Sequence, residues 1–367
     1  MIYRAIGLMS GSSLDGLDIA FVHFHENAGT WIFDIEHAEC YPYPIEWINK
    51  LQNATALNAL DYQLLHSEYG HYLGEKVNAF INKYQIQYQV QFIASHGHTT
   101  FHFPHRKMTA QLGDGAAIAA ETGIPVISDL RALDVALGGQ GAPIVPIGDK
   151  LLFHSYPYCL NIGGIANLSA RNGNAYVSFD VCPANRVLNL LAATAGKEYD
   201  EGGNMAASGT VNDQLLHALN GFPYYQYPFP KSLSNDFGVH EVYPLIRSAE
   251  TSVDDGLRTC VEHIAVQVSF AVEQIKAGGY ANTGAETMLV TGGGAFNTFL
   301  IQRIQEYLDP HQVTLVVPDA KTVKFKEALV MALIGVLRWR EEYNVLSSVT
   351  GATRNSVGGA LWMGQEA

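Results

Sequence analysis

Apolar and polar positions alternate along the first 24 residues, on both sides of a polar turn. Ile6 and Leu8 precede the turn SGSSLDG, and Ile19, Phe21 and Phe24 follow it. Alternation on either side of a short turn of Gly, Ser and Asp predicts two strands joined by a tight connection. The chain therefore begins with a predicted strand, turn and strand between residues 3 and 24.

The same plan returns in the segment CLNIGGIANLSARNGNAYVSFD, residues 159–180. This segment predicts a strand, a glycine pair, an apolar stretch, an Asn-Gly turn and a further strand. Two such units in one chain indicate an internally duplicated fold, although few residues of the two segments are identical.

Apolar residues at helical spacing predict two long helices, one over Leu60 to Ile81 and one over Leu257 to Ile275. Asp254 and Asp255 stand where acidic residues favour the start of a helix. Met288 begins a predicted buried strand that leads into a glycine loop and the helix FNTFLIQRIQEYL. The strand VTLVVP and a helix from Lys326 to about Tyr343 follow. Strands that alternate with helices predict an α/β fold.

Two stretches have no regular period. Residues 220–241 are rich in Tyr, Pro and Phe, which predicts a long loop that is either functional or packed on the surface by its own aromatic side chains. The Gly- and Pro-rich stretch GGQGAPIVP, residues 138–146, is the predicted crossing between two domains.

Composition narrows the classes of function. The 367 residues are 48% hydrophobic and 16% charged, which suits two domains with packed cores. The formal net charge of -13 leaves no electrostatic surface for nucleic acid, and no basic run would dock to a membrane. No apolar run reaches the roughly 18 residues of a membrane span, and the N-terminus lacks a signal-peptide core, so we expect a cytoplasmic protein. The four cysteines form no CxxC pair and are expected as buried thiols.

The first turn is a candidate phosphate site. Its small residues expose backbone N–H groups that can cradle phosphate oxygens, and its hydroxyls add donors. A tight hairpin needs the same residue types, so the turn alone does not separate the two interpretations. It is no Walker A loop, because the GKS/T ending is missing. The residues are Gly11, Ser12, Ser13, Leu14, Asp15 and Gly16.

Two further glycine loops change this picture. Gly163 and Gly164 occupy the matching point of the second hairpin. A third loop follows a predicted strand, where the missing Cβ atoms let a base or ribose approach the backbone; it holds Gly292, Gly293 and Gly294. Three such loops in this order are typical of the superfamily of actin, sugar kinases and heat-shock chaperones.

Longer motifs are more specific. In chain order they are GLMSGSSLDGLD, SHGHT, QLGDG, ALGGQGAPIVP, LNIGGIANLS, TGGGAFN and VTGA. On these motifs, from residue 7 to about residue 352, the chain resembles the anhydro-N-acetylmuramic acid kinase family. The resemblance implies two RNase-H-like domains of the actin-like ATPase fold with an interdomain active-site cleft. We expect one domain at residues 1–128 plus 345–367 and the other at residues 129–344.

The resemblance also implies the reaction. ATP with Mg²⁺ is the phosphoryl donor, water opens the 1,6-anhydro ring of anhydro-N-acetylmuramic acid, and O6 is phosphorylated in cell-wall recycling. The products would be N-acetylmuramate 6-phosphate and ADP. The residues that the resemblance assigns to the nucleotide are Gly11, Ser12, Ser13, Leu14, Asp15, Gly16, Leu17, Asp18, Gly163, Gly164, Gly292, Gly293, Gly294 and Asn297.

Asp180 ends the predicted strand AYVSFD beside the second hairpin. A carboxylate on a rigid strand suits a general base, whereas an Asp at this place can also cap the following turn. The resemblance assigns Asp180 as the catalytic base that activates water. Glu327, in KEAL, matches an acidic residue near the active site of the family.

Arg131, in SDLRALD, is the candidate for reading the lactyl carboxylate of muramic acid, which a guanidinium can hold through two parallel hydrogen bonds. A surface salt bridge to Asp129 or Asp134 is the alternative. His96 and Asp114 lie in SHGHT and QLGDG, which are sugar-side motifs by resemblance.

Two motifs depart from the family pattern. FDTGPGN is FDVCPAN here, so Val181 removes a hydroxyl and Cys182 and Ala184 replace glycines, where a positive φ would be costly. PKSTGRE is PKSLSND at residues 230–236, which loses an Arg. A kinase for a related amino sugar is therefore the alternative function.

His98 and His102 have the i, i+4 spacing of a metal-binding pair, but such a pair must share a helix face. Gly97 and Pro104 favour a strand and loop instead, so no transition-metal site is expected. A non-catalytic nucleotide-binding or chaperone-like relative and a metal-dependent peptidase are the weaker alternatives. ATP and an anhydro amino sugar are the expected partners, and the resemblance alone suggests a homodimer.

Overall fold

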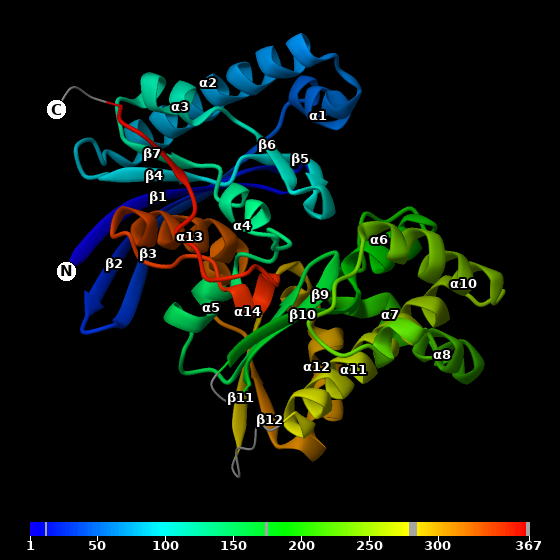
Figure 1. The fold of residues 1–367 in the computed structure, drawn as a ribbon. Coiled ribbons are helices and arrows are strands. Elements are labelled where there is room, and N and C mark those ends of the chain that lie inside the picture. Colours follow the sequence, from blue (N-terminus) through cyan, green and yellow to red (C-terminus); the bar gives the residue numbers. More distant parts are fainter. Residues whose placement is uncertain (12, 173–174, 279–284, 365–367) are drawn as a thin grey trace. The chain divides into compact units, whose positions relative to one another are not determined.

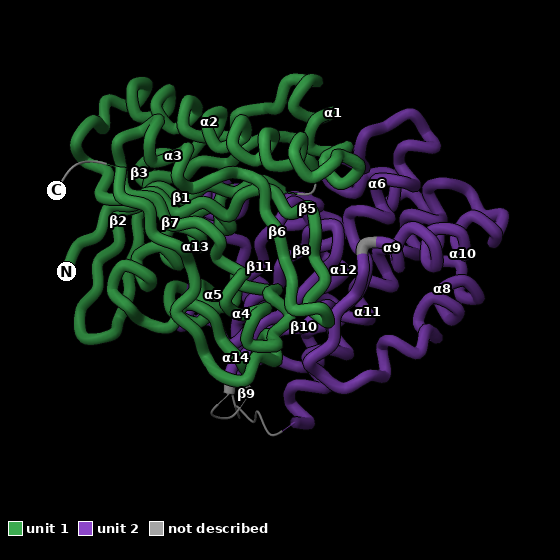
Figure 2. Tube along the Cα trace, turned by 45° about the horizontal axis from the view of Figure 1, so that its top comes forward, with its two compact units in different colours: residues 1–152, 325–367 green, residues 153–324 purple. Residues whose placement is uncertain are grey.

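A computed structural model of the chain describes residues 1–11, 13–172, 175–278 and 285–364. The chain divides into two compact units: unit 1 is Met1–Leu152 with Phe325–Ala367, and unit 2 is Phe153–Lys324 (Figure 2). Each unit is built around its own sheet and its own buried core.

Unit 1 contains a six-stranded sheet in the order β13-β7-β4-β1-β2-β3. β1, β4 and β7 are parallel, and β2 runs antiparallel to both of its neighbours. A separate two-stranded hairpin, β5 and β6, leaves the sheet after β4. The strands are β1 Ile2–Ser10, β2 Gly16–Asn27, β3 Thr30–Pro42, β4 Phe92–Ser95, β5 His98–Phe103, β6 Met108–Leu112, β7 Val126–Ser128 and β13 Ala360–Trp362.

Helices cover both faces of this sheet because successive strand residues point to opposite sides. Ile6 and Leu8 of β1 pack into the core under α2 and α3, whereas Gly7 and Ala94 face α13 so closely that only small residues fit. Figure 1 shows α2 and α3 on one side of the sheet and α13 on the other. The helices are α1 Ile45–Asn53, α2 Ala59–Tyr84, α3 Gly115–Thr122, α4 Ala132–Ala136, α5 Pro146–Leu152, α13 Ala320–Trp339, which begins in unit 2, and α14 Ser347–Thr350.

Unit 2 contains a five-stranded sheet in the order β10-β9-β8-β11-β12. Its strands are β8 Tyr158–Ile162, β9 Ile165–Asn172, β10 Ala175–Pro183, β11 Glu286–Thr291 and β12 Val313–Val316. The helices are α6 Asn185–Ala193, α7 Asn204–Ser208, α8 Asp213–Asn220, α9 Asn235–Phe237, α10 Tyr243–Ser248, α11 Val253–Ala277 and α12 Thr298–Leu308. α11 carries its expected apolar face into the core, and Ser252 caps its first turn beside Asp254 and Asp255.

The two sheets share one topology. Leaving β13 aside, strands of unit 1 follow the order third, second, first, fourth, fifth, and the five strands of unit 2 follow the same order. In both, the second strand is antiparallel and the fourth and fifth are parallel to the first. This is the order of an RNase-H-like domain, so the duplicated α/β fold expected from the sequence is confirmed. The expected Asn-Gly turn of the second hairpin lies partly outside the described residues.

The boundaries between the units differ from those expected. Residues 129–152 and 325–344 belong to unit 1, because α4, α5 and most of α13 pack there. The chain passes between units at Leu152–Phe153 and at Lys324–Phe325, so the stretch GGQGAPIVP is no crossing. That stretch is held inside unit 1 by hydrogen bonds from Gln140 N to Thr350 O and from Gly141 N to Asp134.

α13 begins six residues before the expected Lys326. Asp319 caps its first turn by accepting from Lys321 N and Thr322 N, a polar signal that apolar periodicity does not carry. On α2, Leu60 and Leu64 are 68% and 60% exposed, and the buried face begins at Leu65.

The aromatic stretch 220–241 forms short helical turns around buried Tyr224 and Tyr225. Cys159, Cys182 and Cys260 are buried as expected, but Cys40 is exposed. Within the described residues, no helix has the length and hydrophobicity needed to cross a bilayer.

Candidate active site

The loop between β1 and β2 holds its own shape. Ser13 Oγ donates to Oδ1 of Asp15 at 2.6 Å, and the same oxygen accepts from Gly16 N at 3.1 Å. Leu14 adopts a φ of 59° and buries its side chain in the core. Left-handed backbone is costly for a leucine, and such strain persists where the surroundings enforce it, often at ligand loops. The predicted phosphate-binding residues lie on this loop, with Ser12 outside the described residues.

Four of the loop glycines are not explained by the fold. A Cβ added to Gly11, Gly163, Gly164 or Gly293 would have no neighbour closer than 3.5 Å among the described residues. None of the four has a positive φ. Packing and backbone conformation would therefore tolerate a side chain at these positions, and the missing Cβ atoms leave room for a ligand to approach the backbone.

Three other loop glycines are required by the fold itself. Gly292 has a φ of 81°, a Cβ on Gly294 would strike Ile162, and a Cβ on Gly16 would lie 2.7 Å from Cys40 Sγ. These positions shape the loops, and they carry no separate evidence for a ligand.

Three carboxylates influence one another in unit 1. Burial raises the pKa of Asp18 to about 6, and the charges of Asp15 and Glu327 raise it further, while a hydrogen bond with Cys40 opposes the shift. Burial also raises the pKa of Glu327, against the attraction of Arg131 and Lys326. This corner of unit 1 is therefore electrostatically suited to a cation. The side chains alone do not converge on one point, because no group of three described His, Cys, Asp or Glu residues can hold a metal.

Arg131 makes a fixed unit with His96. Its Nε donates to His96 Nε2 at 2.9 Å, and its Nη1 donates to Gly141 O at 3.2 Å. Burial, together with the Arg131 charge, lowers the pKa of His96 to about 3, so the imidazole is neutral and its Nδ1–H donates to Gly97 O at 2.8 Å. The surface salt bridge considered for Arg131 is wrong, since no described carboxylate pairs with it.

Asp134 ties three sequence motifs together. Its buried carboxylate accepts from Thr350 Oγ1 at 2.7 Å and from Gly141 N at 2.8 Å. SDLRALD, ALGGQGAPIVP and VTGA therefore meet at one buried acid, and Gly141 O is in turn an acceptor for Arg131. Asp129, the other carboxylate near Arg131 in sequence, accepts from Ser128 Oγ.

Asp114 has a structural partner. It caps α3 by accepting from Ala116 N at 2.9 Å, so one oxygen of the expected sugar-side carboxylate is occupied. His98 and His102 lie on strand β5, as the sequence predicted, and not on a helix face.

Asp180, near the end of β10, is held by the aromatic segment of unit 2. Its Oδ2 accepts from Leu233 N at 2.8 Å and from Ser232 Oγ at 3.0 Å. Tyr224 OH donates to its backbone oxygen at 2.6 Å, and its own amide donates to Lys231 O. Oδ1 has no partner among the described residues. Burial raises the pKa of the carboxyl, and the two donors on Oδ2 oppose that shift.

A second layer anchors the aromatic segment to α11. Tyr225 OH lies 3.0 Å from His263 Nε2, and His263 Nδ1 lies 2.7 Å from Asn220 Oδ1. Gln267 Nε2 donates to the same Asn220 oxygen at 2.8 Å. The segment that carries Ser232 and Leu233 is thus connected to a buried helix by a polar network, which limits the freedom of Asp180.

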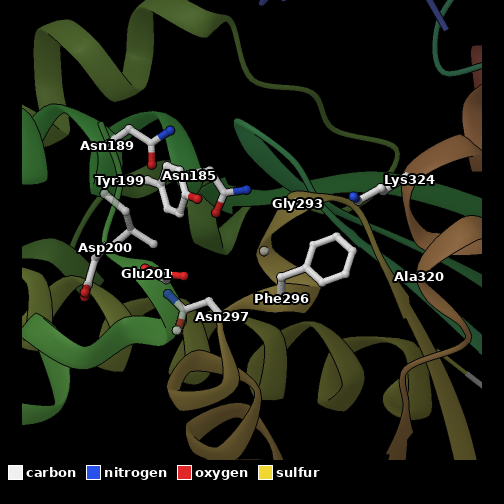
Figure 3. A pocket seen from close by; sticks show the side chains of 13 residues that line it. Asn185, Asn189, Tyr199, Asp200, Glu201, Gly293, Phe296, Asn297, Ala320 and Lys324 are labelled. Atoms are coloured by element: carbon white, nitrogen blue, oxygen red, sulfur yellow. The ribbon is translucent and has the colours of Figure 1, made fainter. Parts of the chain in front are cut away.

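A pocket of about 550 Å³ lies in unit 2 beside the third glycine loop. Figure 3 shows Phe296 near its centre, Lys324 on one side, and Tyr199 and Asn189 on the other. Phe296 is 43% exposed, and Lys324 Nζ lies 5.8 Å from its ring centre. An accessible ring beside bare backbone at Gly293 suits a flat aromatic ligand.

Two polar residues of this pocket are engaged in the fold. Asn297 Oδ1 caps α12 by accepting from Leu300 N, and Asp200 accepts from Met205 N and Ala206 N. The expected nucleotide role of Asn297 therefore stays a prediction, and its cap is the contact that the structure gives.

Comparison with known proteins decides the family. The family model described as "Anhydro-N-acetylmuramic acid kinase" matches residues 3–364. The chain belongs to the anhydro-N-acetylmuramic acid kinase family. A relative of that name from Vibrio parahaemolyticus is 34% identical over 97% of both chains, and one from Haemophilus influenzae is 33% identical over 95% of this chain and 94% of its own.

Solved structures that resemble this family member are more distant. The activator of 2-hydroxyisocaproyl-CoA dehydratase from Clostridium difficile, solved with bound ADPNP, is 15% identical with a TM-score of 0.44, over 92% of this chain and 96% of that chain. Component A of the (R)-2-hydroxyglutaryl-CoA dehydratase of Acidaminococcus fermentans is 12% identical with a TM-score of 0.44, over 90% of this chain and 96% of that chain.

The departures from the family motif at residues 181–184 lie in the core. Val181, Cys182 and Ala184 are all buried in the cluster of unit 2. Neither Cys182 nor Ala184 has a positive φ, so the cost expected for a positive φ does not arise at either residue. The pairing of this strand with β9 has a register shift between Asp180 and Cys182.

Sequence reasoning missed residues that act through distant partners. Tyr224 and Asp180 are 44 residues apart, and Asp134 and Thr350 are 216 apart. No local period marks either pair. The motif PKSLSND could have pointed to Ser232, because a Ser hydroxyl and the backbone N–H of the next residue can both donate to one carboxylate.

Proposed function

We propose that this protein phosphorylates anhydro-N-acetylmuramic acid, with water opening the 1,6-anhydro bridge and the γ-phosphoryl group of ATP passing to O6. The observation that carries this proposal is Asp180, a partly buried carboxylate on β10 with Oδ2 held by two donors and Oδ1 left without a partner among the described residues. A general base needs this combination of fixed position and one open oxygen.

The chemistry of the bridge sets the role of Asp180. O6 of the anhydro sugar is locked in an ether and has no proton to give, so the base takes a proton from water. The resulting hydroxide attacks the anomeric carbon as the bond from that carbon to O6 breaks. O6 then accepts the phosphoryl group, for which alignment and charge neutralisation supply most of the rate.

Unit 1 supplies the groups suited to the sugar. Arg131 keeps its charge although burial lowers its pKa to about 10, and its contacts through Nε and Nη1 to His96 and Gly141 orient the guanidinium. A guanidinium set in this way suits the lactyl carboxylate. The charge of Glu327 raises the pKa of Arg131, and we therefore assign Glu327 to the same site.

The glycine loops suit the nucleotide. The bare backbone at Gly11, Gly163 and Gly164 can donate to phosphate oxygens, and the pocket around Phe296 can take the base. Asp15 and Asp18 would hold Mg²⁺ together with the phosphates, since this ion is usually bound by one or two carboxylates plus phosphate oxygens. When bound, Mg²⁺ neutralises charge on the phosphates. A cytoplasmic location and a homodimer stay predictions.

A different amino sugar is not favoured. The replacements in FDVCPAN are core residues that leave Asp180 and its donors in place. Ser232 of PKSLSND keeps its contact with Asp180.

The deciding experiment measures ADP formation with and without anhydro-N-acetylmuramic acid, in ¹⁸O-labelled water. We expect sugar-dependent ADP release, with one ¹⁸O at the anomeric carbon when the product is analysed before it exchanges with solvent, and none in the phosphate. Asp180→Asn should lower turnover roughly 10²–10⁴-fold without loss of ADP binding. Phosphorylation of an open hydroxyl with no label entering the sugar would identify a conventional sugar kinase instead.

A further inference from the structure

Lys231 is a partly buried lysine in the aromatic segment, and the proposed reaction does not otherwise use its side chain. Its Nζ donates to Tyr225 O at 3.0 Å and, in a longer contact, to Tyr224 O at 3.4 Å. The same atom lies 4.9 Å from the ring centre of Tyr224 and 5.7 Å from that of Phe179. Among the described residues no carboxylate pairs with Lys231, so carbonyl oxygens and ring faces are the partners that the structure gives it.

These contacts hold two parts of the aromatic segment against each other. Tyr224 and Tyr225 lie in a short helical turn near the start of the segment. Lys231 follows later in the chain, directly before Ser232 and Leu233. A cation suits this position, because carbonyl oxygens and the faces of aromatic rings both carry partial negative charge. The ammonium group therefore closes the loop between the helical turn and the residues that follow Lys231.

Both parts of this closed loop reach Asp180. Tyr224 OH donates to the backbone oxygen of Asp180 at 2.6 Å, and Asp180 N donates to Lys231 O at 3.1 Å. The next two residues donate to the carboxylate, Ser232 through Oγ at 3.0 Å and Leu233 through its backbone N–H at 2.8 Å. The ammonium group thus connects the part of the segment that holds the backbone of Asp180 to the part that holds its carboxylate.

The other titratable side chains that interact with Asp180 or with its neighbours are uncharged near neutral pH. They are Tyr224, Cys182, Cys260 and His263. Burial raises the pKa of the tyrosine and of both thiols, and it lowers the pKa of the histidine to about 3. Burial also raises the pKa of Asp180. As the pH falls below neutral, Asp180 is therefore the first of these groups to gain a proton.

We propose that Lys231 is a positioning residue for the reaction, whose ammonium group holds the aromatic segment so that Ser232 and Leu233 keep donating to the carboxylate of Asp180. The inference rests on the proposed function, in which Asp180 is the base. Lys231 acts through these two donors and not by contact with a substrate. Without the ammonium group the donors are loosened. Because they favour the charged form of Asp180, the carboxyl then takes up its proton at a higher pH.

The test compares the pH profile of kcat in the wild type and in Lys231→Met, whose apolar side chain keeps the packing against Phe179. We expect the acid limb to move to higher pH by about one pH unit, the scale of one weakened hydrogen bond to a charged group. The alkaline plateau and the KM for ATP should change little. Lys231→Arg, which keeps charged donors at the end of the side chain, should return the limb most of the way to its wild-type position.

Lys197→Met is the matched control, because Lys197 is an exposed lysine of the same unit, and it should leave the limb in place. A loss of kcat at every pH with no movement of the limb in Lys231→Met would overturn the positioning role and leave a structural one. A raised KM for ATP with an unmoved limb would also overturn it, and would assign Lys231 to the phosphates. A wild type without sugar-dependent ADP release would instead overturn the proposed function.

A second measurement follows the carboxyl ¹³C shift of Asp180 with pH and needs no turnover. The pKa should be higher in Lys231→Met than in the wild type, and Lys231→Gln, which keeps one donor group, should show a smaller rise and serves if the methionine variant does not fold. In a Ser232→Ala background the effect of Lys231→Met should shrink, because one of the donors that Lys231 positions is already gone. An unchanged pKa of Asp180, or a full additional rise in the double variant, would overturn the inference.

Discussion

At the scale of single residues, the environment of Asp180 sets its chemistry. Burial favours the neutral carboxyl, while Ser232 and Leu233 favour the charged form through hydrogen bonds to Oδ2. These opposing effects keep a partly buried carboxylate usable as a base. The balance also makes the protonation of Asp180 sensitive to one exposed hydroxyl.

Ser232→Ala is expected to raise the pKa of Asp180, because the lost hydroxyl stabilised the charged form. A base with a raised pKa is protonated earlier as the pH falls, so the acid limb of the kcat profile should move to higher pH. The plateau at alkaline pH should change little, and Ser232→Thr should restore the limb. A lowered plateau with an unmoved limb would show that Ser232 serves only to shape the loop.

The ionised form of Asp18 lowers the stability of the folded protein in the absence of its proposed ligand, Mg²⁺. Its pKa is raised to about 6, mainly by burial and further by Asp15 and Glu327. Ionising a group whose folded-state pKa is raised lowers stability. The stabilising contribution of the neutral form is complete below about pH 4 and is lost as the pH rises through about 6.

Asp18→Asn is therefore expected to melt at a higher temperature than the wild type at pH 8, and at nearly the same temperature at pH 4. The same variant should bind Mg²⁺–ATP more weakly, because the carboxylate that repels its neighbours is the one assigned to the ion. Scanning calorimetry over this pH range and titration with Mg²⁺–ATP measure the two effects. Equal melting temperatures of the variant and the wild type at pH 8 would show that ionised Asp18 does not lower the stability of the protein.

At the scale of elements, α5 and α13 are joined by a buried ion pair. Asp149 Oδ1 and Lys326 Nζ are 2.6 Å apart, and both side chains are 4% exposed. Gly148 lets the helices approach, since a Cβ there would strike Val330. The pair stands next to Glu327, so it fixes the part of α13 that carries this carboxylate.

Asp149→Ala is expected to lower the free energy of unfolding by about 3–5 kcal/mol, because it leaves a buried ammonium group without its carboxylate. The double variant Asp149→Leu with Lys326→Met should recover most of that loss, since apolar side chains of similar volume need no charge partner. Urea unfolding of the three proteins measures the difference. A double variant as unstable as the single one would show that packing, and not the loss of the ion pair, dominates.

At the scale of the whole molecule, the two units carry different groups that the proposed function uses. Arg131, His96 and Glu327 belong to unit 1, and Asp180 and the pocket around Phe296 belong to unit 2. The net charge of -13 opposes anionic ligands, so each unit needs local donors to hold them.

A substitution in unit 1 should therefore weaken binding of the sugar, and a substitution in unit 2 should weaken binding of the nucleotide. Arg131→Ala is expected to raise the KM for the muramic sugar roughly 10- to 150-fold, the scale of a lost charge-assisted hydrogen bond, with little change in the Kd for ADP. Phe296→Ala should raise the Kd for ADP about tenfold through lost stacking, with little change in the KM for the sugar. Kinetics and calorimetric titration of both variants provide the comparison. An equal effect of either variant on both ligands would contradict this division.

Local patterns in the sequence were sufficient for the elements that depend on near neighbours. The period of α11 predicted its buried face, because every turn of that helix meets the same core. On α2 the same reasoning overextended the buried face to Leu60 and Leu64, because the period of a helix does not say where its neighbours end. α13 starts earlier than predicted, after the cap formed by Asp319, because the apolar period of a helix does not show where its polar first turn begins.

The sequence by itself determined the α/β class, the two hairpins, the three glycine loops and the place of Asp180 on a strand, although that strand continues past the predicted end at Asp180 to Pro183. These follow from alternation, turn residues and spacing, which are local properties of the chain. Only the tertiary structure decided that Ser232 and Leu233 hold Asp180 and that Asp134 joins three motifs. Each of these contacts joins segments far apart in the chain, and such pairings are set by the way whole elements pack.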